Sequence, residues 1–238
     1  MARRALILVE GNTVGYTGLL YVQAAKHLGL YPITVSADPA QYDYLAAEGN
    51  EAIQVDPENL DALIRECYRL RATYDIAGIT GVREAFLATV GKLCQHFHLP
   101  GPNPTSIERC CDKFTQRQLL AEAGVPTPTY CVATNAIDVE RFAAEIGLPV
   151  VLKPVMGNGG NGVRLCRDVD ELAEHTAYLL GGKHIWRCSP RILVEEFAQG
   201  PLYIAQVMGN EVIAIGAALY GPPPHFVCRQ LNYPARLT

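Results

Sequence analysis

The sequence predicts an α/β protein in which a parallel-sheet domain precedes a mixed α+β region. Three observations predict this. The first hundred residues alternate strand-like and helix-like segments, which is typical of a parallel sheet covered by helices. The segment Leu99-Pro-Gly-Pro-Asn-Pro104 holds three prolines, and so many helix-breaking residues mark a domain boundary. After about Gly124 the alternation ends, and neighbouring strand-like segments are arranged as hairpins.

In the first region, β-branched and apolar runs predict strands, and apolar residues at helical spacing predict helices. Gly29 supplies the stop signal of the first helix. The expected strands cover residues 5–9, 32–36, 51–55 and 75–80, and the expected helices cover residues 19–28, 60–70 and 83–97.

In the second region a helical pattern ends at Gly124, and strands and helices then follow in irregular order. A hairpin turned by Gly209-Asn210 comes last. The expected helices cover residues 106–123, 137–146 and 168–180, and the expected strands cover residues 129–133, 191–197, 202–208 and 211–218.

Composition excludes several classes of protein. The chain has 238 residues and a net charge of −4, so it lacks the basic surface of a nucleic-acid-binding protein. No apolar run approaches the roughly 18 residues of a membrane span. The apolar run at residues 5–9 is too short for a signal peptide and is interrupted by Glu10. Eight cysteines without a Cys-x-x-Cys spacing predict buried, reduced thiols, and we expect a cytoplasmic protein.

The segment Pro149–Cys166 is the most informative part of the chain. Within it Gly157, Gly159 and Gly162 match the letters of the dinucleotide-binding pattern, but that pattern opens a helix, whereas strand-like residues follow here. A P-loop is excluded because no Gly-Lys-Ser/Thr follows the glycines. The segment therefore predicts strand, flexible loop and strand, a hairpin that can fold over phosphates.

The charged residues beside this hairpin could be solvated surface residues or could point into a cleft. Lys153 lies in an apolar run, so it either reaches water at a sheet edge or points into a cleft where an anion compensates it; the glycine loop favours the cleft. Lys113 alone is typical of a solvated helix. Glu195 and Glu196 end a strand and must point to opposite faces, so at most one need enter a cleft.

Dinucleotide binding at the N-terminus is an open alternative. Three glycines, at positions 11, 15 and 18, lie between a strand and a helix, and Asp38 follows about where a ribose-binding acid would stand. The spacing is Gly-x-x-x-Gly-x-x-Gly, however, and a tight or substrate-contacting turn explains it better.

In combination, these elements resemble the ATP-grasp superfamily of carboxylate–amine ligases. The matching segments, in order, are Cys111-Asp-Lys113, Pro149–Pro154 with Gly157–Gly162, and Leu193-Val-Glu-Glu-Phe197-x-x-Gly200. Residues 11–18 and 36–39 are similar to the amino-acid ligase branch, some of whose members are fused to an argininosuccinate-lyase-like domain. The resemblance implies a pre-ATP-grasp domain over residues 1–102, an ATP-grasp subdomain with its glycine-rich lid over 103–191, and the incomplete start of a second subdomain over 192–238.

The resemblance also implies roles for individual residues. Lys113 and Lys153 would hold ATP phosphates, Gly157–Gly162 would form the phosphate lid, Glu195 would accept from the adenine amino group, and the backbone near Phe197-Ala198 would complete the adenine pocket. The family activates a carboxylate as an acylphosphate, which an amine then attacks. The predicted ATP-binding residues are Lys113, Lys153, Gly157, Asn158, Gly159, Gly160, Gly162, Glu195, Glu196, Phe197 and Ala198.

Two positions depart from the family pattern. Leu202 stands where a ribose-binding acid is common, and Gln206 replaces an acid at the end of the following strand. The family's Mg²⁺ ligands lie further along than Tyr233-Pro-Ala-Arg-Leu237, so we expect them beyond this chain, which resembles a C-terminally truncated form.

The sequence thus predicts the front part of an ATP- and Mg²⁺-dependent ligase of small carboxylates and amines, with an amino acid as the expected carboxylate. The resemblance allows a homodimer, and we expect no nucleic acid or membrane partner and no turnover by the chain alone. The alternatives are a nucleotide-binding module without turnover and a Rossmann-type NAD(P)-binding protein.

Overall fold

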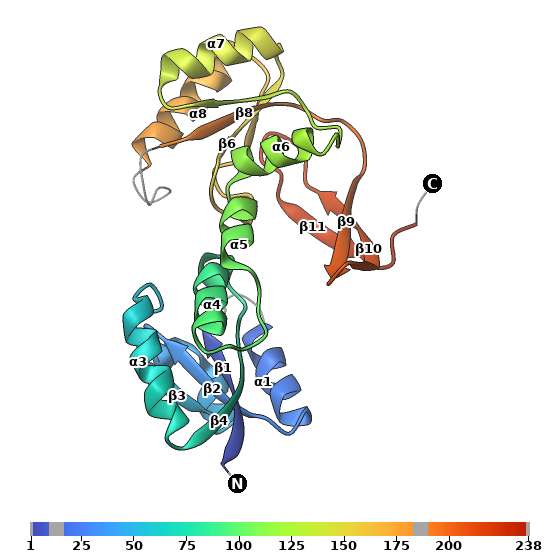
Figure 1. The fold of residues 1–238 in the computed structure, drawn as a ribbon. Coiled ribbons are helices and arrows are strands. Elements are labelled where there is room, and N and C mark those ends of the chain that lie inside the picture. Colours follow the sequence, from blue (N-terminus) through green and yellow to red (C-terminus); the bar gives the residue numbers. More distant parts are fainter. Residues whose placement is uncertain (1, 10–16, 183–189, 237–238) are drawn as a thin grey trace. The chain divides into compact units, whose positions relative to one another are not determined.

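The computed structural model describes residues 2–9, 17–182 and 190–236, and these form two compact units, Met1–Cys111 and Asp112–Thr238 (Figure 1). Each unit has a hydrophobic core of its own. The seven cysteines within the described ranges are free thiols, as expected, although Cys110 and Cys228 are exposed. No helix in the described ranges is long and apolar enough to cross a membrane.

The first unit is built on a four-stranded sheet of order β3-β2-β1-β4, parallel throughout. Its centre, β1 and β2, is buried because helices cover both faces. The strands are β1 (Arg3–Val9), β2 (Tyr31–Ser36), β3 (Glu51–Gln54) and β4 (Tyr74–Gly81).

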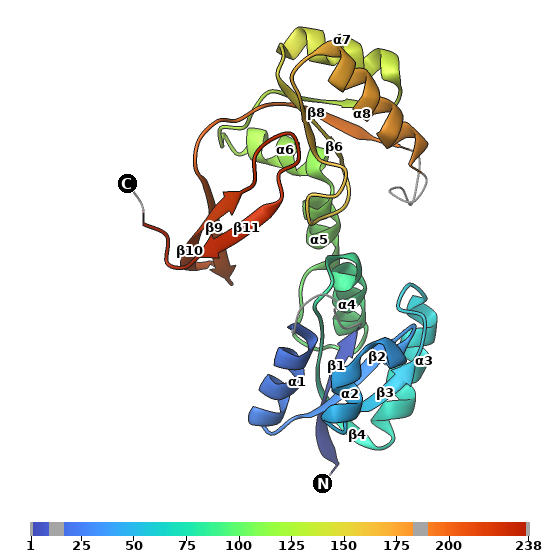
Figure 2. The same ribbon diagram turned by 180° about the vertical axis from the view of Figure 1, so that it is seen from behind.

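The helices of the first unit lie on both sides of this sheet (Figures 1 and 2). Right-handed crossovers require this, because the chain moves one way from β1 to β3 and then returns to β4 on the other side. Alternate β1 residues Ala5, Ile7 and Val9 pack in one core with residues of α3 and α4. The helices are α1 (Thr17–His27), the short η1 (Pro39–Gln41), α2 (Asp43–Ala47), α3 (Leu60–Arg71), α4 (Glu84–His96) and α5 (Pro104–Cys111).

The second unit contains an antiparallel sheet of order β5-β8-β6-β7. Helices α7 and α8 pack side by side on one face, and α6 lies on the other side of the sheet near β5 (Figures 1 and 2). The elements are α6 (Lys113–Glu122), β5 (Tyr130–Ala133), α7 (Ala136–Ile146), β6 (Val150–Pro154), β7 (Arg164–Cys166), α8 (Val169–Gly181) and β8 (Ile192–Glu196).

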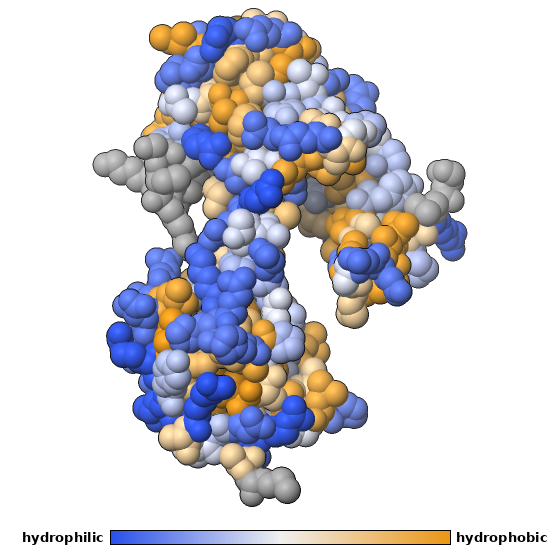
Figure 3. Space-filling view, viewed as in Figure 1, coloured by the Kyte–Doolittle hydropathy of each residue, from blue (hydrophilic) through white to orange (hydrophobic). Residues whose placement is uncertain are grey.

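A three-stranded antiparallel sheet of order β11-β10-β9 follows, formed by β9 (Leu202–Met208), β10 (Glu211–Tyr220) and β11 (Cys228–Asn232). The predicted turn at Gly209-Asn210 joins β9 to β10, with Gly209 at a φ of 60°. Apolar side chains on these strands are largely exposed, including Val207, Met208 and Ile213, and apolar residues gather over this region in Figure 3.

The predicted α/β class and nearly all expected elements are confirmed. One expectation was wrong: residues 106–123 do not form one helix, because Asp112 adopts an extended backbone (φ −86°, ψ 107°) and separates α5 from α6. The short α2 and strand β11 were not expected. Of the N-terminal glycines, Gly11 and Gly15 lie outside the described residues.

Candidate functional site

The site forms where strand alternation separates two kinds of side chain. On β6 and β8, Val150, Leu152, Ile192 and Val194 belong to the core shared with α7 and α8. Their neighbours in sequence, Lys153 and Glu195, therefore point to the opposite face of the sheet. Lys153 pairs across the sheet with Leu193, so Glu195 lies two residues along the neighbouring strand. This places a lysine and a carboxylate within reach on one face.

Lys153 and Glu195 form a buried ion pair. The Lys153 Nζ donates to Glu195 Oε2, and the side chains are only 13% and 7% exposed. The other Glu195 oxygen accepts from Arg117 Nε at 2.6 Å, and the Arg117 side chain is 20% exposed. Glu195 is thus held between two cations. Because a carboxylate has about four acceptor positions, an adenine amino group would be a third donor to it.

Helix α6 delivers the second predicted lysine. Its N-cap is Asp112, whose side chain accepts from Thr115 N–H at 2.8 Å. Lys113 follows directly: its N–H donates to Val155 O at 2.8 Å, and its Nζ donates to Gly157 O at 2.5 Å. The Lys113 side chain therefore lies at the start of the glycine loop.

The helix N-cap also carries an ion pair, in which Arg191 Nη1 donates to Asp112 Oδ2 at 2.6 Å. Burial favours a higher pKa for Asp112, but the bonds from Thr115 and Arg191 outweigh it and hold that pKa below its usual value. Asp112 is therefore a carboxylate at neutral pH. It joins the start of α6 to the residue that precedes β8.

The glycine segment is a strand–loop–strand hairpin, as predicted. β6 pairs with β7 in antiparallel register, with Val150 opposite Cys166, and residues 157–161 between them are exposed. Gly162 illustrates why the loop needs glycine. Its φ is +70°, and an added Cβ would lie 3.1 Å from atoms of Leu179 and Pro154. A helix does not follow the loop, which rules out the dinucleotide pattern for this segment.

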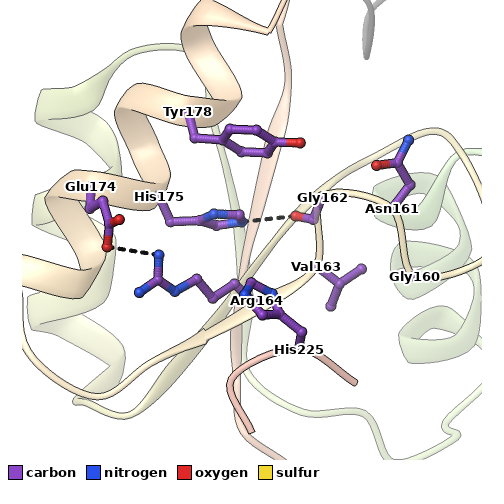
Figure 4. A pocket seen from close by; sticks show the side chains of 9 residues that line it. All are labelled: Gly160, Asn161, Gly162, Val163, Arg164, Glu174, His175, Tyr178 and His225. Atoms are coloured by element: carbon purple, nitrogen blue, oxygen red, sulfur yellow. Dashed lines mark hydrogen bonds and ion pairs between the residues drawn. The ribbon is translucent and has the colours of Figure 1, made fainter. Parts of the chain in front are cut away.

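A cavity of about 280 Å³ lies between the base of this loop and α8 (Figure 4). His175 Nε2 donates to Gly162 O at 2.9 Å, which fixes the proton on Nε2 because a carbonyl only accepts. Burial lowers the pKa of His175 despite this bond. Tyr178 stacks on the imidazole, and Arg164 pairs with Glu174 at 2.8 Å. His225 completes the lining from the loop before β11.

The remaining predicted residues end β8. Glu196 is exposed and accepts from Thr129 N–H at 3.0 Å, which is the main reason that its pKa is lowered. The two acids of the pair thus differ, as the strand geometry predicts, with Glu195 buried and Glu196 exposed. Phe197 is half-buried beside Phe226, with ring centroids 5.9 Å apart, and Ala198 is exposed.

The structure therefore gathers Lys113, Lys153 and Glu195 about the β6 end of the glycine loop. Asp38, the alternative ribose acid, caps η1 instead and accepts from Ala40 N–H at 3.2 Å. Sequence reasoning missed Arg117, Arg191 and His175. A signal existed for Arg117, which is one helical turn after Lys113. Within the described ranges, no three His, Cys, Asp or Glu side chains are grouped to hold a metal ion.

Comparison with known proteins identifies relatives of both the sequence and the fold. Residues 112–214 match the family model of the carbamoyl-phosphate synthase L chain, ATP binding domain. The chain is 61% identical over 236 residues to the uncharacterized protein y4rH of Sinorhizobium fredii, covering 99% of this chain and 49% of that protein. The chain thus spans about half the length of this curated relative.

Two solved structures share the fold. The L-amino acid ligase from Bacillus licheniformis has a TM-score of 0.76 at 22% identity, covering 100% of this chain and 56% of the ligase. The second is the biotin carboxylase domain dimer of the Hydrogenobacter thermophilus 2-oxoglutarate carboxylase, in complex with MgADP, ADP and bicarbonate. Its TM-score is 0.65 at 24% identity, and the match covers 85% of this chain and 46% of the carboxylase chain.

Proposed function

We propose that this chain, whose residues 112–214 match an ATP-binding domain family, is the ATP-binding part of an ATP-grasp carboxylate–amine ligase. The observation that carries the proposal is the position of Lys113 and Lys153 at the start of a glycine loop with exposed backbone. Two ammonium groups and a run of N–H groups are suited to the charge on a transferring phosphoryl group.

The reaction has two steps. A carboxylate oxygen of the substrate attacks the γ-phosphorus of ATP, and ADP leaves, so that an acylphosphate forms. The amine then attacks the acyl carbon, phosphate leaves with the bonding electrons, and the amine gives up a proton to yield an amide. The glycine hairpin would exclude water from the acylphosphate, which otherwise hydrolyses.

We further propose specific contacts and a substrate. Lys113 and Lys153 hold phosphate oxygens, residues 157–162 cover them, and Glu195 with the backbone at 197–198 receives adenine. The carboxylate is an amino acid, which the fold shared with the B. licheniformis L-amino acid ligase supports. Mg²⁺ would accompany ATP and neutralise phosphate charge, but the described residues group no ligand set for it, so no step is assigned to a metal held by this chain.

Thermal unfolding with and without nucleotide tests the proposal. Mg-ATP is expected to raise the Tm, because a ligand that binds only the folded chain stabilises it by mass action. Lys153→Ala and Lys113→Ala should each abolish most of the shift. The matched control is Lys92→Ala, whose lysine pairs with Glu108 in the first unit and should leave the shift intact. A shift produced by NAD(H) and not by Mg-ATP would contradict the proposal.

A further inference from the structure

Arg117 has no role in the motif set, yet among the described residues of the second unit it belongs to a cluster of charged side chains that are 20% exposed or less. It donates to one oxygen of Glu195 while Lys153 donates to the other. Its own position is fixed by α6 and by a second bond, from Arg117 Nη1 to Gln116 Oε1 at 3.1 Å. Two cations therefore share one carboxylate that is only 7% exposed.

This arrangement limits what Lys153 can do. The Lys153 ammonium has three N–H donors and can hold Glu195 and a phosphate at once, but its single positive charge is then divided between two anions. A buried carboxylate with too little positive charge beside it is strongly unfavourable. A lone Glu195–Lys153 pair would therefore compete with ATP for the lysine. Arg117 removes this competition, because its guanidinium holds the other oxygen of Glu195 and compensates the carboxylate when Lys153 binds a phosphate.

We propose that Arg117 is a positioning residue for nucleotide binding, which keeps Glu195 compensated so that Lys153 is available to an ATP phosphate. This inference rests on the proposed function. It goes beyond that function because it assigns the affinity for ATP partly to a side chain that acts through Glu195 and Lys153. Lys113 lies one turn earlier on α6 and contacts the glycine loop. The same helix therefore carries one lysine of the site and the arginine that contacts the partner of the other.

The test is the Kd of ATP, measured by calorimetry with the full chain. Arg117→Met keeps an unbranched apolar stem and removes the guanidinium, and it should raise the Kd at least about tenfold, which corresponds to about 1.4 kcal/mol. Arg117→Lys restores a cation and should recover most of the affinity. The matched control is Arg141→Met, because Arg141 is 56% exposed and pairs with Asp138 on α7.

A double variant separates this role from a purely structural one. In a Glu195→Gln background the carboxylate charge is gone, so adding Arg117→Met should change the Kd less than about threefold relative to Glu195→Gln alone. The double variant leaves no carboxylate without a cation, and the Lys153 ammonium keeps the amide oxygen of the Glu195→Gln side chain as an acceptor, so it should fold even if Arg117→Met does not. An equally large loss in both backgrounds would overturn the inference, as would wild-type affinity in Arg117→Met. Failure of the unchanged chain to bind ATP would overturn the proposed function as well.

Discussion

At the scale of single residues, burial and hydrogen bonding decide what a titratable group can do. His175 is 4% exposed, donates to Gly162 O and is stacked on Tyr178, so its neutral form is built into the base of the glycine loop (Figure 4). Arg164 lines the same cavity, and its positive charge adds to burial in lowering the pKa of His175. Protonation of His175 should therefore loosen this region.

The pH dependence of stability tests this. Because the pKa of His175 in the folded chain is below its ordinary value of 6.5, the unfolded chain takes up the proton first as the pH falls. The contribution of neutral His175 to the free energy of unfolding is therefore complete above about pH 6.5. It is lost as the pH falls through the lower pKa of the folded chain. The Tm of His175→Gln should depend less on pH than the wild-type Tm between about pH 6.5 and 5. A control, His27→Gln on the exposed end of α1, should keep the wild-type slope. Equal slopes in all three proteins would contradict the assignment.

Residue roles were predictable where a local pattern determines them. The alternation of a strand is enough to place Glu195 inside and Glu196 outside, and an apolar run with one lysine is enough to direct Lys153 toward an anion. The anion that Lys153 meets in the structure is Glu195, which lies 42 residues away in sequence. Arg117 and Arg191 were missed for the same reason, since each finds its carboxylate 78 or 79 residues away.

At the scale of elements, the start of α6 shows how a single residue divides a helical pattern. Residues 106–123 have helical spacing throughout, but the side chain of Asp112 caps the backbone of Thr115, and its carboxylate pairs with Arg191. Aspartate is among the preferred N-cap residues, so the end of one helix and the start of the next could have been predicted at Asp112. The partner Arg191 was not, because it precedes a strand on another part of the chain.

Two substitutions separate the cap from the ion pair. Asp112→Asn keeps an oxygen for Thr115 N–H and loses the charge, whereas Asp112→Ala loses both. We expect Asp112→Ala to lower the free energy of unfolding by about 1–3 kcal/mol and Asp112→Asn by clearly less, as measured by urea denaturation. Asn135→Ala is the control, because Asn135 caps α7 through Asp138 N–H without an ion pair to another segment. If Asp112→Asn were as damaging as Asp112→Ala, the ion pair rather than the cap would be the dominant contribution.

Elements as a whole were predicted well where periodicity is strong and poorly where it is weak. The four strands of the parallel sheet have apolar, β-branched runs and were all expected. Strand β11, Cys-Arg-Gln-Leu-Asn, is exposed along its whole length and has no apolar alternation, so only its pairing with β10 makes it a strand. The five-residue helix α2 is too short to carry a periodic signal.

At the scale of the whole molecule, two cores are the organising feature. One joins the parallel sheet with α3 and α4 and includes Leu63, and the other joins β6 and β8 with α7 and α8 and includes Leu179. The proposed nucleotide contacts, Lys113, Lys153 and Glu195, all belong to the unit that begins at Asp112. Nucleotide binding energy should therefore stabilise that unit directly.

Calorimetric unfolding should resolve two transitions that respond differently. Leu63→Ala and Leu179→Ala each empty a fully buried position, which costs about 2–5 kcal/mol and should lower one transition by several degrees. Leu63→Ala is expected to act on the first unit and Leu179→Ala on the second. Mg-ATP should raise the transition that Leu179→Ala lowers and leave the other nearly unchanged. A single transition displaced equally by both variants would mean that the units unfold together, and nucleotide would then stabilise the whole chain.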